Sequence, residues 1–295
     1  MQSEKQGIFA KQALTEDEMT EIQQLAVICN TFESLHIRLP HAKMFKTRSE
    51  NEILDFLYYE EGRLVGYLGI DEYGSKEKDF EGMVHPEHRR KGIASRLLQA
   101  AKEEARHSGI EQLILTCEPS SNSGTAFAKA IHAHPAFSEH VMVLRTYKER
   151  PLFDERLTFR QAVSVDDLAM VASIMATDMG DIEQAKRYVA DMTKQDNQRF
   201  YLMTFGGPEV GCDEAIGSLR VSKMEQRTGI YGFVVRPEYR GKGYGRQLLQ
   251  EAIRIIRDEG SQEIVLDVDV DNTNALGLYL SCGFEIKTTY DYYSL

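Results

Sequence analysis

The sequence contains no apolar run that approaches the roughly 20 residues needed to cross a bilayer. Its first residues, Met1 to Gln6, lack the apolar core of a signal peptide. The four cysteines form no C-x-x-C pair and are typical of the unpaired thiols of a reducing compartment: they are Cys29, Cys117, Cys212 and Cys282. The sequence therefore predicts a cytoplasmic protein that has no membrane partner.

Histidine is missing from the second half of the chain, because the last of the eight histidines is His140. A histidine general base is therefore excluded beyond that point. The close pairs His85/His88 and His132/His134 have no evident third ligand, so we predict that the protein holds no metal ion.

The chain has fewer basic than acidic residues, since 35 Lys and Arg against 46 Asp and Glu give a formal net charge of −11. A nucleic-acid-binding protein normally shows a basic face, so we predict no nucleic-acid partner. The charge fits a protein that handles cationic small molecules, and it fits equally well a solvated acidic surface. With 295 residues, the chain is long for one α/β domain and comfortable for two.

A glycine-rich stretch follows an expected strand over residues 230–235 and precedes an expected helix. It reads Val-Arg-Pro-Glu-Tyr-Arg-Gly-Lys-Gly-Tyr-Gly-Arg over residues 235–246. Glycine lets successive backbone N–H groups turn toward one point, and a helix N-terminus adds unpaired donors there. The stretch favours a pyrophosphate-binding loop with positive charge from Arg240, Lys242 and Arg246. A plain strand-to-helix turn is the alternative.

Two familiar nucleotide-binding patterns do not fit this loop. A dinucleotide-binding fold needs G-x-G-x-x-G, whereas the order here is R-G-K-G-Y-G. The P-loop needs Gly-Lys followed by Ser or Thr, whereas Gly243 follows Lys242.

A second block, Asn-Thr-Asn-Ala-Leu-Gly-Leu-Tyr-Leu-Ser-Cys-Gly-Phe over residues 272–284, follows an expected strand over residues 263–270. The first block resembles the coenzyme-A loop of the GNAT superfamily of N-acetyltransferases, Arg/Gln-x-x-Gly-x-Gly/Ala after a strand that ends in Val-x-Pro. The second block resembles the closing motif of the same superfamily, N-x-x-A-x-x-L-Y-x-x-x-G-F. An amphipathic helix ended by a glycine would explain Gly283 but not the other positions of the motif.

An internal repeat extends the resemblance to the first half of the chain. Residues 84–99 lie over residues 235–250 without a gap, and Arg89 falls on Arg240 at an offset of 240 − 89 = 151 residues. We therefore expect an α/β protein of two tandem GNAT-like domains, each a twisted mixed β-sheet flanked by helices. The domains are expected at residues 1–150 and 157–295, with a polar linker over residues 149–156. This tandem architecture is similar to that of mycothiol synthases, which keep their competent site in the second domain.

Hydrophobic periodicity predicts the elements of both copies. Helices are expected over residues 14–32, 93–107, 166–175 and 182–192, and the first begins with a capping signal at Thr15 to Glu18. Further strands are expected over residues 53–59, 63–71, 80–84, 112–117, 141–147, 157–162, 199–204, 214–223 and 284–292.

The resemblance implies acetyl-CoA (coenzyme A) as the cofactor of the second domain. The family places the acyl carbonyl against a backbone N–H of the strand before the loop, here near Phe233, Val234 and Val235. Asn272 would hydrogen-bond the cofactor arm or cap the following helix, and Asn274 belongs to the same motif. The loop residues that would meet the pyrophosphate are Arg240, Gly241, Lys242, Gly243, Tyr244, Gly245 and Arg246.

Acetyl transfer to an amine needs a polarised carbonyl, an amine that loses a proton and a thiolate that gains one. The resemblance places Val235 beside the carbonyl and Tyr279 where the family carries its tyrosine acid. A phenol, whose ordinary pKa is about 10, can protonate a nearby thiolate.

The general base is left open by the residues. Asp269 is one candidate, in an alternating series with Asp267 and Asp271 on one face of a strand, and Glu225 is another. The series could equally be solvated carboxylates at a strand end, and a chain of water molecules could replace a dedicated base.

The first copy keeps the loop pattern and loses the tyrosine. The block over residues 121–129 puts Ala128 or Lys129 in the place of Tyr279, and residues 136–137 match residues 283–284 after four extra residues. The first domain is therefore expected to be catalytically degenerate, although its loop could still hold a pyrophosphate. The residues of this loop are Val84, Arg89, Arg90, Lys91, Gly92, Ile93 and Ala94.

The leading hypothesis is an acetyl-CoA-dependent N-acetyltransferase whose second domain acts on a primary amine of a small molecule or a peptide. A non-catalytic acyl-CoA sensor or scaffold is the main alternative, and the intact motif around Tyr279 argues against it. An aminoacyl-tRNA-dependent ligase would need a tRNA-binding surface, which conflicts with a net charge of −11. The sequence leaves open the acceptor, whose site is expected near residues 30–50 and 176–195, and the oligomeric state.

Overall fold

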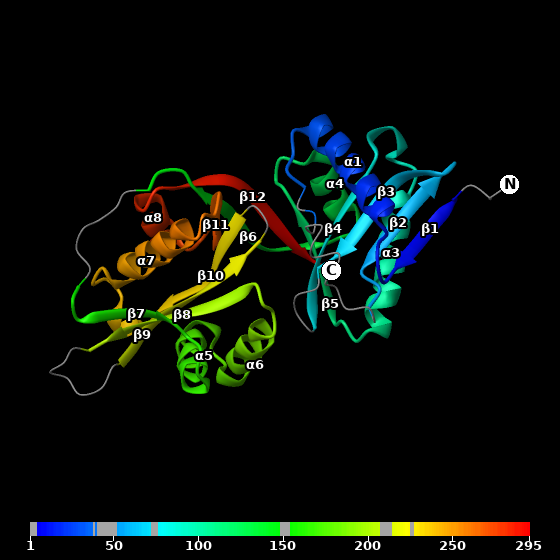
Figure 1. The fold of residues 1–295 in the computed structure, drawn as a ribbon. Coiled ribbons are helices and arrows are strands. Elements are labelled where there is room, and N and C mark those ends of the chain that lie inside the picture. Colours follow the sequence, from blue (N-terminus) through cyan, green and yellow to red (C-terminus); the bar gives the residue numbers. More distant parts are fainter. Residues whose placement is uncertain are drawn as a thin grey trace. The chain divides into compact units, whose positions relative to one another are not determined.

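The computed structural model describes residues 5–37, 39, 52–71, 76–147, 154–206, 214–224 and 227–295. The chain divides into two compact units (Figure 1). The first unit comprises Met1–Glu139 and Thr288–Leu295, and the second comprises His140–Lys287. Each unit combines a mixed β-sheet with helices, which confirms the predicted α/β class.

The first unit is built on strands in the order β1-β2-β3-β4-β5-β12. Neighbouring strands from β1 to β4 are antiparallel, and β4 is parallel to β5. The end of β12 pairs antiparallel with β5, with Asp291 opposite Cys117. The strands are β1 (Gly7–Lys11), β2 (Asp55–Glu60), β3 (Arg63–Ile70), β4 (Glu77–Val84), β5 (Gln112–Cys117) and β12 (Phe284–Ser294).

Helices cover both faces of this sheet, because side chains along a strand alternate between faces. Leu57 and Tyr59 of β2 pack against α1, whereas Phe56 and Tyr58 belong to the core that contains α3. The capping box predicted at Thr15 and Glu18 is present at the start of α1. The helices are α1 (Glu16–Glu33), η1 (Pro86–His88), α3 (Ile93–His107) and α4 (Asn122–Ala130).

The second unit is built on strands in the order β6-β11-β10-β9-β8-β7. Strands β7 to β10 are antiparallel neighbours, and β10 is parallel to β11. The strands are β6 (His134–Leu144), which begins in the first unit, β7 (Leu157–Gln161), β8 (Gln198–Phe205), β9 (Glu214–Lys223), β10 (Arg227–Val235) and β11 (Glu263–Asp269).

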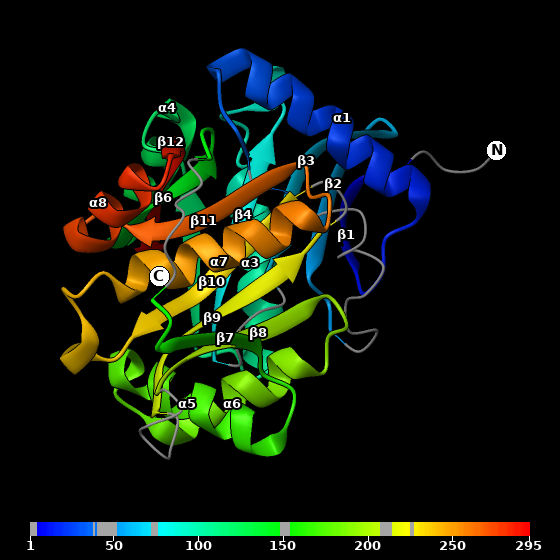
Figure 2. The ribbon, with the colours of Figure 1, turned by 60° about the vertical axis from the view of Figure 1, so that its left-hand side comes forward.

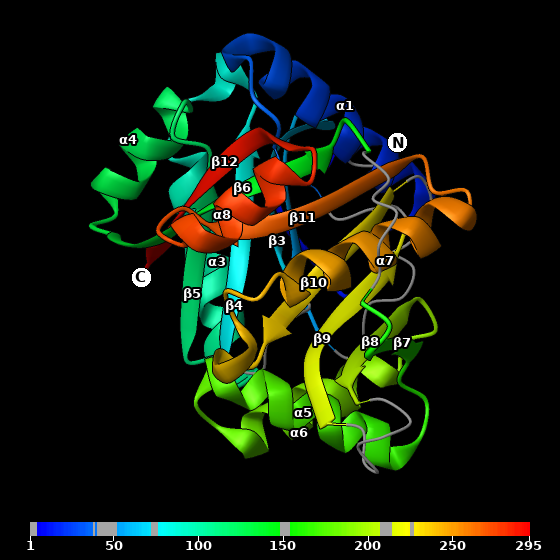
Figure 3. The same cartoon turned by 90° about the vertical axis from the view of Figure 1, so that its left-hand side faces the viewer.

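In this unit, α7 lies on one face of β8, β9 and β10, and α5 and α6 lie on the other (Figure 2; Figure 3). Leu248 and Leu249 of α7 share a core with Leu219 and Val221, and the α5–α6 pair shares a separate core with Leu202. The helices are α5 (Val165–Met179), α6 (Ile182–Thr193), η2 (Pro237–Tyr239), α7 (Tyr244–Asp258) and α8 (Thr273–Ser281).

The sequence repeat is also a structural repeat. Helix α3 begins at Ile93 and α7 begins at Tyr244, so the offset is 244 − 93 = 151 residues. Helix α4 begins at Asn122 and α8 begins at Thr273, again 273 − 122 = 151 residues apart. The tandem arrangement predicted from the loop pattern is therefore confirmed.

The structure differs from the expected elements at two strands. Strand β1 was not anticipated, and β6 begins at His134 instead of near residue 141. The expected linker over 149–156 lies largely outside the described residues. The two compact units part within β6 and within β12, so the last eight residues, Thr288–Leu295, belong to the first unit and not to the second.

Candidate acetyl-CoA site in the second unit

Strand β10 stops pairing with β11 midway along its length, and its pairing with β9 is interrupted there. Its parallel pairing with β11 covers Arg227 to Ile230. Its antiparallel pairing with β9 is irregular between Tyr231 and Val234, and Gly232 within this irregularity has a φ of +54°. A bulge of this kind bends a strand and frees backbone groups. The segment from Tyr231 to Val235 therefore offers amide and carbonyl groups along the side where the pairing with β11 has ended.

The loop after β10 has the geometry of an anion cradle. Gly241 and Gly243 adopt φ values of +73° and +85°, and a Cβ at either position would meet nothing within 4 Å. Gly243 is the N-cap of α7 and supplies no side chain to the first amides of that helix. Those amides have no partner within the helix, and the helix dipole adds partial positive charge. The loop therefore fits the pyrophosphate of coenzyme A.

Two of the three basic side chains of this loop have no carboxylate partner in the described ranges. Arg240 is anchored, because its Nε donates to the Val235 carbonyl at 2.7 Å and its Nη2 lies 2.6 Å from Asp178. Lys242 lies 5.2 Å above the ring of Tyr239, and Arg246 donates to the sulfur of Cys282 at 3.7 Å. Lys242 and Arg246 can therefore meet a phosphate without first breaking an ion pair.

Tyr279 lies at the junction of α8 and β10. Tyr279 is 5% exposed, and its ring packs edge-on against the ring of Phe233, with 5.9 Å between the ring centroids. Burial, followed by the nearby Cys282 thiol, raises the pKa of Tyr279 above its ordinary value. The hydroxyl therefore keeps its proton at neutral pH, which a proton donor requires.

The residues between β11 and α8 have local structural roles. A carboxylate oxygen of Asp269 accepts from the Asp271 backbone N–H at 2.7 Å, and the Asn272 side chain accepts from the Ala275 N–H at 3.1 Å. Asn272 therefore caps α8, as one of its two predicted roles required. The cofactor role of Asn272 and the role of Asp269 as a base stay predictions, and Glu225 lies outside the described residues.

In the first unit, two basic side chains of the equivalent loop lie beside carboxylates. Arg89 donates to the Val84 carbonyl as Arg240 does to Val235, but it also pairs with Glu33 at 3.1 Å, where both side chains are mostly buried. A second carboxylate, that of Glu60, lies 3.8 Å from Lys91. An incoming pyrophosphate would have to compete with these carboxylates.

The structure resolves which residue replaces the tyrosine in the first unit. Ala128 is the seventh residue of α4, as Tyr279 is the seventh of α8, and it is 2% exposed. The two helices also end alike, since His132 has a φ of +56° where Gly283 has +97°. The predicted match of residues 136–137 to residues 283–284 is therefore wrong, and Phe137 is 41% exposed.

The physical reason for this error is the residue type at the helix end. Gly283 is required, because a Cβ there would lie 1.7 Å from the Thr146 carbonyl oxygen. Histidine also adopts positive φ more readily than most residues, so His132 ends α4 without a glycine. A small residue followed by phenylalanine, the pattern of residues 283–284, occurs four positions later, at residues 136–137.

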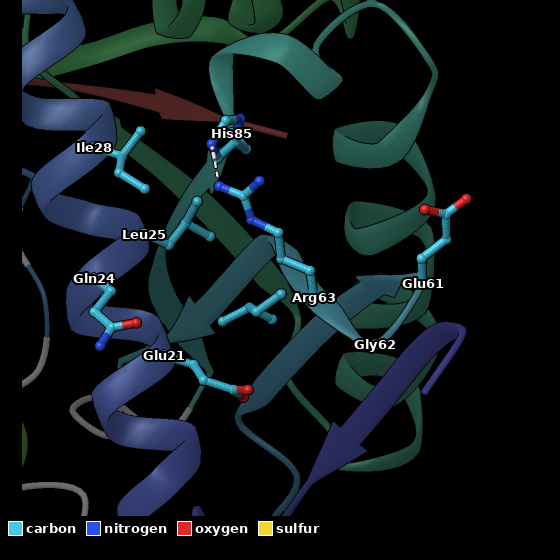
Figure 4. A pocket seen from close by; sticks show the side chains of 9 residues that line it. Glu21, Gln24, Leu25, Ile28, Glu61, Gly62, Arg63 and His85 are labelled. Atoms are coloured by element: carbon cyan, nitrogen blue, oxygen red, sulfur yellow. Dashed lines mark hydrogen bonds between the residues drawn. The ribbon is translucent and has the colours of Figure 1, made fainter. Parts of the chain in front are cut away.

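The first unit contains a separate pocket of about 400 Å³ on the α1 side of its sheet (Figure 4). Figure 4 shows Gln24 and Leu25 of α1 facing Arg63, whose guanidinium reaches up to His85. Arg63 lies 2.9 Å from Nε2 of His85, and burial followed by this cation lowers the pKa of His85. None of the loop residues predicted to bind the cofactor lines this pocket.

Among the described residues, no three His, Cys, Asp or Glu side chains group as metal ligands would. None of the helices in these ranges combines the length and apolar character needed to span a membrane.

Two regions of the chain match the acetyltransferase (GNAT) family, residues 19–132 and residues 168–284. The chain therefore belongs to this family, and it is an enzyme of the N-acetyltransferase class. The mycothiol acetyltransferase of Nocardiopsis dassonvillei is 26% identical to it over 261 residues, which cover 79% of each chain.

Solved structures share the fold over nearly the full length. A GCN5-related N-acetyltransferase from Sphaerobacter thermophilus has a TM-score of 0.77 at 19% identity, over 98% of this chain and 95% of that one. A tandem GNAT protein from the clavulanic acid biosynthesis pathway has a TM-score of 0.68 at 20% identity, over 98% of this chain and 97% of that one. At these identities the likeness concerns the fold.

Proposed function

We propose that the second unit transfers an acetyl group from acetyl-CoA to a primary amine of a small molecule or a peptide. The observation that carries the proposal is a convergence within this unit. Three features meet where β10 leads into α7 and packs on α8: the free edge of β10, two cations that have no carboxylate partner among the described residues, and a buried tyrosine. The first unit has the loop without the tyrosine, and two of its three basic side chains, Arg89 and Lys91, lie beside carboxylates.

Each part of this site fits one part of the cofactor. Lys242, Arg246 and the first amides of α7 would hold the pyrophosphate. The backbone of Tyr231 to Val235 would pair with the amides of the pantetheine arm as an added strand does. Acetyl-CoA supplies an acyl group activated as a thioester, and an N–H of the same segment would polarise its carbonyl.

Tyr279 would hold a proton at its hydroxyl oxygen for the departing sulfur. Its raised pKa keeps this proton on the hydroxyl at neutral pH, so the proton is available as the C–S bond breaks and negative charge develops on the sulfur. The amine would lose its proton to water or to a carboxylate such as Asp269. The relatives named mycothiol acetyltransferase, of which one matches 79% of the chain, support a small-molecule acceptor. A cytoplasmic location is part of this proposal, because the described cysteines Cys29, Cys117 and Cys282 are free thiols.

Calorimetric titration of acetyl-CoA into the wild-type protein, Gly243→Asp and Gly92→Asp tests the cofactor site. An added carboxylate in the loop should repel the pyrophosphate at that site alone. Both glycines are N-caps with positive φ, and a Cβ at either one has open space, so the two variants are matched. We expect Gly243→Asp to abolish binding and Gly92→Asp to leave it within about 3-fold of the wild-type value, since surface changes perturb stability little.

The outcomes separate the alternatives. Loss of acetyl-CoA binding in Gly92→Asp would show that the cofactor site lies in the first unit. A wild-type protein that does not bind acetyl-CoA would overturn the proposed function.

A further inference from the structure

An arginine on β9 lies on the α6 side of the second unit's sheet. Leu219 and Val221 of β9 belong to the core with α7, so Arg220 between them faces α6. Its Nε donates to the hydroxyl of Tyr188 on α6 at 2.9 Å, and its Nη1 donates to the side-chain oxygen of Gln198. Three fixed groups therefore orient the guanidinium, because the Tyr231 ring also lies 4.8 Å from it.

This guanidinium is partly buried and has no carboxylate partner among the described residues. Neighbouring arginines of the same unit do have one, since Arg199 makes two bonds of 2.5 and 2.6 Å to Glu259 and Arg160 lies 2.7 Å from Asp167. Arginine cannot avoid the free-energy cost of burying its charge by losing its proton, because its guanidinium stays protonated. Its Nη2 makes no hydrogen bond within the described ranges. Arg220 is therefore an oriented cation whose Nη2 N–H donors can bind a ligand.

The position of Arg220 places this cation close to the site proposed for acyl transfer. Arg220 is directly opposite Tyr231 in the β9–β10 register. Tyr231 is the first residue of β10 beyond its pairing with β11, and Phe233, two residues later, contacts Tyr279. Tyr279 and the α7 loop therefore approach this part of β10 from one side, and Arg220 lies on the other.

We propose that Arg220 binds an anionic oxygen group of the acceptor, so that the acceptor is a primary amine that also carries a carboxylate or a phosphate. The proposal rests on the function proposed above. The free N–H donors of Arg220 would bond the anion, and the rings of Tyr188 and Tyr231 would wall the subsite. An amine held in this way would reach the acyl carbon from the α6 side of β10.

Matched pairs of acceptors test this inference. Coenzyme A release would be measured at saturating acetyl-CoA with α-amino acids against their primary amides, and with phosphoethanolamine against ethanolamine. The wild-type protein should prefer the anionic member of one of these pairs, and the preferred pair tells carboxylate from phosphate. In Arg220→Gln, kcat/KM for that anionic amine should fall about 10- to 100-fold, mainly through KM, and for its neutral partner by less than about 3-fold.

Arg199→Gln is the control variant. It removes a partly buried arginine from the neighbouring strand β8, on the opposite face, and breaks the pair with Glu259. It should lower the melting temperature without changing the preference for anionic amines. The Arg220→Lys variant keeps the charge without the planar fork, and it should recover part of the preference.

Each result decides one question. An equal loss for anionic and neutral acceptors in Arg220→Gln, or a wild-type protein without preference for either anionic group, overturns this inference and leaves the proposed function standing. Failure of the wild-type protein to bind acetyl-CoA in the titration described above overturns the proposed function itself.

Discussion

At the scale of single residues, the two loops differ in their electrostatic partners more than in their sequence. Arg89 and Arg240 make the same bond to the preceding strand, yet Arg89 is held by the mostly buried Glu33 and Arg240 by the half-exposed Asp178. An exposed ion pair is worth little and yields readily to a stronger anion, whereas a buried pair does not. Two loops with one pattern therefore have different capacities to bind a phosphate.

The role of Tyr279 as proton donor predicts the behaviour of Tyr279→Phe. The change removes one hydroxyl and keeps the ring contact with Phe233, so the fold should persist. We expect kcat to fall about 100-fold or more, as for the loss of a general acid, with the Kd for acetyl-CoA almost unchanged. Steady-state kinetics together with titration of acetyl-CoA checks both expectations.

The same tyrosine also makes the stability of the folded protein depend on pH in the alkaline range. Its pKa is raised in the folded state, so the unfolded chain releases the proton first as the pH passes about 10. The contribution of Tyr279 to stability is therefore complete below that pH and is lost as the pH rises toward the folded-state pKa. Unchanged kcat in Tyr279→Phe would contradict the role of Tyr279 as the general acid.

At the scale of elements, the start of α5 joins local and tertiary interactions. Ser164 and Asp167 form a capping box, and Arg160 of β7 lies 2.7 Å from Asp167. The hydrogen bond from Arg160 holds the pKa of Asp167 well below its usual range. This pair therefore ties α5, which covers the α6 side of the sheet, to the edge strand.

Asp167→Asn should lower the free energy of unfolding by about 1 to 2 kcal/mol at pH 7, the range for a lost cap. Because the folded-state pKa is depressed, this contribution exists above the ordinary aspartate pKa of about 4 and is lost as the pH falls toward the folded-state pKa. Urea unfolding at pH 7 and at pH 3 measures the difference. Asp166→Asn, in the same turn, is the control, and an equal effect of both changes would contradict the assignment.

At the scale of the whole molecule, the last residues of the chain complete the first unit. Tyr290 and Tyr292 are both buried, and the Tyr290 hydroxyl donates to the His36 carbonyl at 2.5 Å. Thr288 donates to Glu118 at 3.0 Å, and Asp291 stands opposite Cys117 of β5. The first unit therefore cannot be complete until residues 288–295 have been synthesised.

Deletion of residues 288–295 should destabilise the first unit selectively. It removes two buried tyrosines and the strand beside β5, and the loss of one large buried aromatic side chain alone costs about 3 to 5 kcal/mol. Hydrogen exchange should show lost protection in α1 and β2 and retained protection in β9 and α7. Equal loss in both units, or in neither, would contradict the prediction, and Tyr290→Phe, which removes one hydrogen bond, should have a small effect.

Much of this protein follows from its sequence, because local interactions determine it. The bounds of α3, Ile93–His107, and of β5, Gln112–Cys117, agree with the predicted ranges, since apolar spacing and a terminal glycine define them. The glycine loops and the place of Tyr279 in the closing motif could also be read from the residues. Their repetition at one offset predicted two tandem copies of one fold.

Interactions between distant residues were decided by the tertiary structure. The carboxylates beside Arg89 and Lys91 of the first loop, Glu33 and Glu60, are remote from it in sequence. The pairing of β12 with β5 could not be predicted from the sequence either, because alternating side chains define the faces of a strand and not its neighbour. That no carboxylate of the described residues pairs with Arg220 emerges only when β8, β9, β10 and α6 are assembled. Local propensity thus determined the helices, the strands and the motif, and long-range packing determined which charges stay available for a ligand.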